Sequence, residues 1–142
     1  MNTKLNLMQW TMASLAVFVI ITIFTFVMIR LGVEPWVSPI PQDQVTLTDR
    51  IATYLSRLIL AGLFTYIFTK TTYEDKSSIG HGLRYGFGMG LLMFVPNFVA
   101  RIVHADSPIT VQGTFMVVGV IQSIVCGAAM AYLYKSDKPK NS

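Results

Sequence analysis

Four apolar stretches, separated by short polar segments, make up most of this chain. They cover residues 11–29, 51–69, 83–103 and 113–134. A hydrocarbon core about 30 Å thick needs about 20 helical residues at about 1.5 Å each, so every stretch is long enough to cross a bilayer as a helix. The pattern therefore predicts an all-α polytopic membrane protein, a bundle of four transmembrane helices.

The short polar segments leave no room for a second domain. We expect a single membrane domain over residues 1–142, ending in a short tail at 135–142. A composition that is 53% hydrophobic and 13% charged agrees with this class. The first stretch is too long for the apolar region of a signal peptide and ends without a small-residue cleavage site, so we interpret it as a retained helix. Because it is apolar all round, we expect it to form a lipid-facing wall.

Lysine and arginine are divided unevenly between the two sides that four crossings would define. The N-terminal tail, the second connection and the C-terminal tail contain every lysine of the chain, whereas the opposite side has Arg30, Arg50 and Arg101. The positive-inside rule then places both termini in the cytoplasm. The same bias explains the net charge of +4. No basic stripe with interleaved aromatic residues indicates nucleic-acid binding.

Local signals predict where individual helices begin. Thr46 and Asp49 form a variant of the capping box, which predicts a helix start near Thr46. Ser107 followed by Pro108 is typical of an N-cap and a first helical position. Pro96, inside the third stretch, predicts a kink.

Small residues recur every four positions in the third and fourth stretches, as in a glycine zipper. The third has Gly82, Gly86 and Gly90, and the fourth has Gly119, Ser123, Gly127 and Ala131. Close backbone approach is a main source of helix association in lipid, because burial of apolar surface gives little there. We expect these two faces to pack against each other within one chain. The alternative is a homo-oligomer that uses one of these faces between chains.

A few polar side chains lie at membrane depth and form the candidate site: Arg57, Asn97, Arg101 and Gln122. Charge at such depth is costly unless it is paired, hydrated or able to reach the headgroups. In one interpretation, Arg57 extends outward to the headgroups while Asn97 and Gln122 form interhelical hydrogen bonds. In the other, the four side chains converge on an outward-facing cationic cavity that suits a small anion or an anionic headgroup.

Candidate chemistry is sparse. Cys126, the one cysteine, lies inside the fourth stretch and reads as a packing residue, and with only His81 and His104 as histidines we expect no metal site and no cofactor. No stretch contains an acidic residue, which disfavours a proton-coupled relay. His104 and Asp106 lack a clear nucleophile beside them, so the sequence favours a non-enzymatic protein over a lipid-modifying enzyme.

The segment Phe64-Thr65-Tyr66-Ile67-Phe68-Thr69-Lys70 and the opening Gly82-Leu83-Arg84-Tyr85-Gly86 resemble small four-helix membrane proteins of bacteria whose activity is uncharacterised. The resemblance implies a location in the cytoplasmic (inner) membrane and no known reaction. The leading hypothesis is a protein that acts through helix packing with itself or with a larger membrane partner. The alternative is a subunit of a small oligomeric transporter or channel, with Arg57 and Gln122 lining its path.

Overall fold

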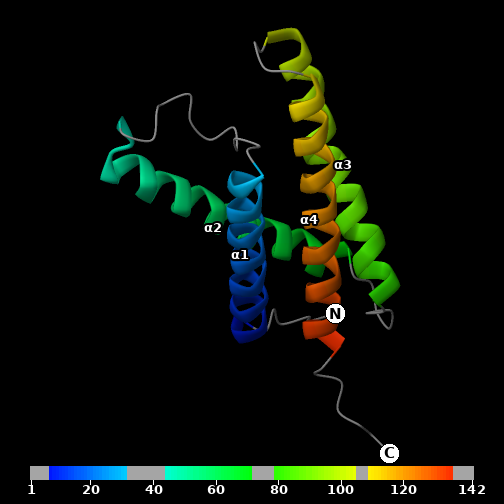
Figure 1. Ribbon diagram of the computed structural model, residues 1–142. Helices are drawn as coiled ribbons and strands as arrows, with labels where there is room; N and C mark the ends of the chain where they lie inside the picture. The colour runs from blue at the N-terminus through cyan, green and yellow to red at the C-terminus, as the bar shows by residue number, and fades with distance from the viewer. Residues whose placement is uncertain (1–6, 32–43, 72–78, 105–108, 136–142) are drawn as a thin grey trace, which may run out of the picture.

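The computed structural model describes residues 7–31, 44–71, 79–104 and 109–135. Four α-helices account for almost all of them: α1 (Leu7–Arg30), α2 (Leu47–Thr71), α3 (Ile79–His104) and α4 (Ile109–Lys135). The start of α1, the end of α2, the start of α3 and the end of α4 lie at one end of the molecule (Figure 1). Successive helices therefore run in alternating directions.

Each of the four helices is long and apolar enough to cross a membrane. The prediction of an all-α protein with four candidate spans is therefore confirmed. The helices also extend a few residues past the apolar stretches on which the prediction was based. At 24 to 27 residues each, they reach beyond the length that a hydrocarbon core of about 30 Å requires.

The predicted capping box is present at the start of α2. The Asp49 carboxylate accepts hydrogen bonds from the backbone N–H of Thr46 (2.9 Å) and from its hydroxyl (2.6 Å), while the Asp49 N–H donates to the Thr46 hydroxyl (3.2 Å). This reciprocal pair satisfies donors that a helix start leaves without intrahelical partners. The corresponding prediction at Ser107 and Pro108 lies outside the described residues. Helix α3 continues through Pro96 as one element.

Helices α3 and α4 form the most extensive contact in the molecule. A methyl group added at Gly86 would lie 2.7 Å from the Cα of Ile124, and one added at Gly127 would lie 2.9 Å from the Cα of Gly86. Gly82 faces the Gly127 carbonyl at similarly close range. The small residues of both helices thus let the two backbones touch, and this surface is used inside the chain.

Helix α1 packs against both α2 and α4. One stripe of it is buried, comprising Ala13, Ser14, Val17, Ile21 and Met28. The expectation of a lipid-facing wall is wrong for this stripe and fits only the opposite side of the helix. The uniform hydropathy of α1 hides the inward face. What distinguishes that face is in part the small size of Ala13 and Ser14, which allows close approach.

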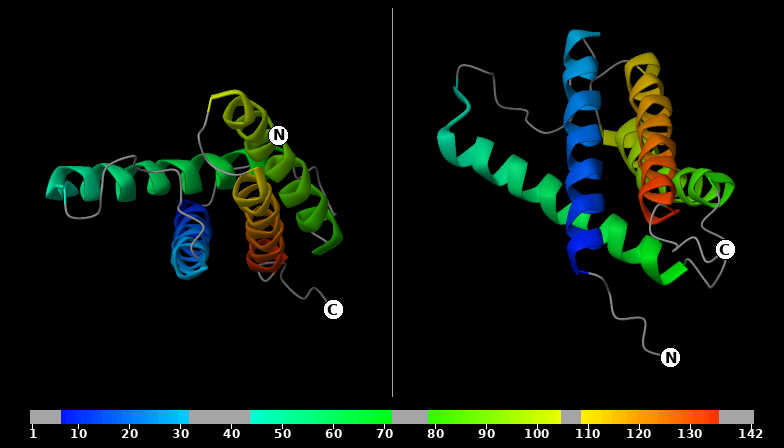
Figure 2. Two further views of the ribbon diagram at one scale, coloured as in Figure 1. Left: turned by 45° about the horizontal axis from the view of Figure 1, so that its top comes forward. Right: turned by 90° about the horizontal axis from the view of Figure 1, so that it is seen from below.

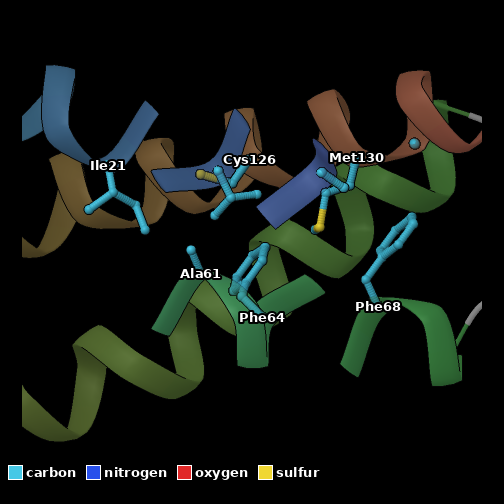
Figure 3. Packing of buried hydrophobic residues seen from close by; sticks show 9 residues of the cluster. Ile21, Ala61, Phe64, Phe68, Cys126 and Met130 are labelled. Carbon is cyan, nitrogen blue, oxygen red and sulfur yellow. The ribbon is translucent and has the colours of Figure 1, made fainter. Parts of the chain in front are cut away.

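Helix α2 is steeply inclined to α1 and meets the other helices over its C-terminal half (Figures 1 and 2). Ala61, Phe64 and Phe68 of this half join the buried cluster, where they meet Ile21, Cys126 and Met130 of α1 and α4 (Figure 3). The N-terminal half of α2 extends away from α3 and α4 in every view. The core therefore lies around the C-terminal half of α2, and the other half is left largely uncovered.

Candidate functional site

One side of α2 is apolar and buried toward its C-terminus but basic and more exposed toward its N-terminus. Residues spaced alternately by four and three positions share one side of a helix. On α2 these residues are Arg50, Tyr54, Arg57, Ala61, Phe64 and Phe68. Phe68 is fully buried, Arg57 is half-buried and Arg50 is exposed. The side that packs into the core thus continues outward as a row of two arginines with a tyrosine between them.

Arg57 lies near the middle of α2, where the sequence places its costliest charge. Its guanidinium carbon is 5.6 Å from the centroid of the Tyr54 ring, within range of a cation–π interaction. Among the described residues it forms no ion pair and no side-chain hydrogen bond. An arginine at the centre of a membrane helix costs about 2.5 to 3.5 kcal/mol on insertion scales, and the Tyr54 ring offsets only part of that cost.

The other members of the predicted cavity lie on different helices. Asn97 of α3 and Gln122 of α4 are both half-buried, and neither forms a side-chain hydrogen bond with another described residue. The side chain of Arg101 is outside the described part of the structure. Nothing among the described contacts joins Arg57 to Asn97 or Gln122. A cavity formed by these residues within one chain stays a prediction.

The C-terminal half of α2 is held by a cluster of aromatic side chains that sequence reasoning did not identify. The ring of Phe68 lies 5.1 Å from that of Tyr85, 5.9 Å from that of His81 and 5.8 Å from that of Tyr134. The Tyr85 hydroxyl donates a 2.7 Å hydrogen bond to the backbone carbonyl of Phe64. This hydrogen bond joins two different helices. Tyr85 therefore fixes α2 against α3.

Serine and threonine hydroxyls bond within their own helices. Thr53 donates to the carbonyl of Asp49 (2.8 Å), Thr65 to that of Ala61 (2.9 Å) and Ser123 to that of Gly119 (3.0 Å). Such bonds to carbonyls one turn earlier satisfy the hydroxyl without a neighbouring helix. These hydroxyls are hydrogen-bonded within their own helices and do not form a common polar site.

Helix α1 has two buried polar atoms without a hydrogen-bond partner among the described residues. The Trp10 indole packs beside Gly62, with its Cζ2 atom 3.4 Å from the position of an added methyl group. The two atoms are the Nε1 of Trp10 and the hydroxyl oxygen of Ser14. An unsatisfied buried polar group costs about 1 to 3 kcal/mol. These two groups therefore reduce the stabilisation that the burial of α1 provides.

Two further predictions concern reactive groups. Cys126 is buried between the helices as a packing residue, 2% exposed. Within the described ranges no three His, Cys, Asp or Glu side chains gather as a metal-binding group. Asp106 and the side chain of His104 lie outside the described residues, so the lipid-modifying alternative remains as the sequence left it.

Protein-family models, curated proteins and solved structures were all compared with this chain, and none of them matches it.

Proposed function

We propose that this chain is a non-enzymatic, multi-pass protein of the bacterial cytoplasmic membrane, with both termini cytoplasmic, that acts by packing α2 against a second copy or a larger membrane partner. The observation that carries the proposal is the course of α2, whose N-terminal half leaves the other helices. Leu55 and Ile59 on this half are 54% and 55% exposed.

The surface available for association follows from the small-residue faces. A methyl group added at Gly82, Gly86 or Gly90 would meet atoms of α4 in the same chain. These glycines lie against α4 of the same chain, which favours another surface for a partner. The lysine bias and the alternation of helix directions support the orientation with cytoplasmic termini.

Cysteine cross-linking in native membranes tests the proposal. In full-length protein carrying C126A, single cysteines replace Leu55 or Ile59 on α2, or Leu92 on α3 as a control. Leu92 is 70% exposed, so it is at least as open to random collision. We expect a bifunctional maleimide to yield a defined adduct from the α2 positions and little from Leu92. An adduct of twice the 15.8 kDa monomer mass identifies a second copy, and any other defined mass identifies a partner.

Two results would contradict the proposal. No adduct from either α2 position would remove α2 as an association surface. Equal yields from the α2 positions and from Leu92 would indicate that the cross-links arise from random collision. The transporter or channel alternative requires several copies around a shared path, so a species that stays monomeric in membranes also argues against it.

A further inference from the structure

The arginines of α2 need an anionic partner that the described chain does not supply. Asp49 is the only acidic residue in the four helices. Its carboxylate already accepts two hydrogen bonds from Thr46. A second copy could therefore bring only one carboxylate from these helices to Arg57, and its Oδ2 atom is already bonded to Thr46. This makes a second copy a poor source of the missing charge.

The two arginines lie on nearly the same side of α2, about two turns apart. Seven residues separate Arg50 from Arg57, which corresponds to about 10 Å along the helix axis. The Tyr54 ring stands between them and contacts the Arg57 guanidinium at 5.6 Å. Helix α2 is steeply inclined to α1 (Figure 2), and an inclined helix carries a residue less deep into a bilayer than an upright one does.

The residues beside this row are apolar and exposed. Ile51 is 58% exposed and Leu58 is 47% exposed, and both lie about a quarter-turn from the arginines on the helix circumference. A ligand that matches this surface has a negative head for the guanidinium groups, with its glycerol region near Ile51 and hydrocarbon for Leu58. An anionic phospholipid has both parts, whereas a soluble anion has only the first.

We propose that the side of α2 formed by Arg50, Tyr54 and Arg57 binds an anionic phospholipid, with its phosphate between Arg50 and Arg57 and an acyl chain along Leu58. This inference rests on the membrane insertion included in the proposed function. Arginine suits the task because its planar guanidinium binds phosphate through two parallel hydrogen bonds.

Native mass spectrometry of the full-length protein tests the assignment. Protein in non-ionic detergent is mixed with equal amounts of phosphatidylglycerol and phosphatidylcholine, and the ratio of the two lipids retained is measured. We expect the wild type to prefer phosphatidylglycerol and R57Q to lower the ratio about fivefold, since one basic side chain near an anionic lipid surface contributes a factor of this order. R57K should give an intermediate ratio, because lysine keeps the charge but not the two parallel hydrogen bonds. R84Q, which removes an exposed arginine of α3, is the matched control and should leave the ratio unchanged.

Three results overturn the proposal. R57Q with the wild-type ratio removes Arg57 as the site. An equal loss in R84Q reduces the preference to general charge attraction. Displacement of the lipid by inorganic phosphate makes this a small-anion site. If R57Q does not fold, as judged by its helical circular dichroism, R50Q at the exposed start of α2 takes its place with the same expected direction.

The lipid site and the association surface can fail separately. Leu55 and Ile59, used for cross-linking, lie on the side of α2 opposite the arginines. Cross-links without a phosphatidylglycerol preference refute the lipid site alone. A preference that depends on Arg57 without cross-links refutes the association alone.

Discussion

Replacing Gly86 by alanine tests whether the backbones of α3 and α4 are in contact. The added methyl group would lie 2.7 Å from the Cα of Ile124, about 0.7 Å inside the 3.4 Å at which ordinary van der Waals contact begins. The obstructing atoms are backbone atoms, which cannot rotate away as a flexible side chain could. Overpacking costs typically about 1 to 3 kcal/mol, and for this reason we expect a cost of about 3 kcal/mol.

Gly88 is the matched control for this substitution. It lies two residues away on the same helix, and a methyl group added there meets nothing within 4 Å. Both substitutions gain about 1 kcal/mol of helix propensity, so the difference in unfolding free energy between G86A and G88A isolates the packing term. At roughly 3 °C per kcal/mol for a chain of this size, G86A should melt about 10 °C below G88A.

The single cysteine provides the assay. Cys126 on α4 is 2% exposed, so a fluorogenic maleimide reacts with it only when the helices separate. Heating detergent-solubilised protein with this reagent gives a melting curve that reports on α4 directly. G86A melting at the temperature of G88A would show that the two backbones are not in contact. G88A melting well below the wild type would show instead that replacing this glycine by alanine does not give the expected gain in helix propensity.

Three further predictions concern individual contacts and the orientation. T46A should remove the N-cap of α2, lowering the stability of its first turn by about 1 kcal/mol, which amide hydrogen exchange measures; unchanged exchange would mean that the bonds to Asp49 contribute nothing. Y85F keeps the ring but loses the bond to the Phe64 carbonyl, so the unfolding free energy should fall by about 1 kcal/mol, and a wild-type melting curve would contradict that role. A reporter protein that is active only in the cytoplasm should be active when fused to either terminus. An inactive fusion at the C-terminus would refute four crossings with this orientation.

Features set by neighbours along the chain were predictable from the sequence. Thr46 and Asp49 lie three residues apart, and their reciprocal hydrogen bonds depend only on local backbone geometry. The four helices follow from the lengths of the apolar stretches. The spacing of Gly82 and Gly86 pointed to a smooth helix face, and the expectation that α4 covers it needed only a neighbour with matching small residues.

Features set by contacts between distant residues were not predictable. The Tyr85 hydrogen bond to Phe64 joins positions 21 residues apart. The hydropathy pattern does not distinguish Tyr85 from any other tyrosine near a helix end. The inclination of α2 depends on how it packs against α1 and on the contacts of its aromatic half, which no periodicity encodes. Arg57 stood out as costly from sequence alone, yet its position on the side continuous with Phe64 and Phe68 became clear only once burial was known.

The uneven attachment of α2 has a mechanical consequence for a bilayer of changing thickness. A rigid helix adapts to hydrophobic mismatch by tilting, and the backbone contact between α3 and α4 ties the tilts of those two helices together. Helix α2 is fixed at one half only, where Tyr85 bonds to Phe64. In a chain inserted as proposed, α2 would be able to tilt about this half, where α1 and Tyr85 hold it, while α3 and α4 keep their packing.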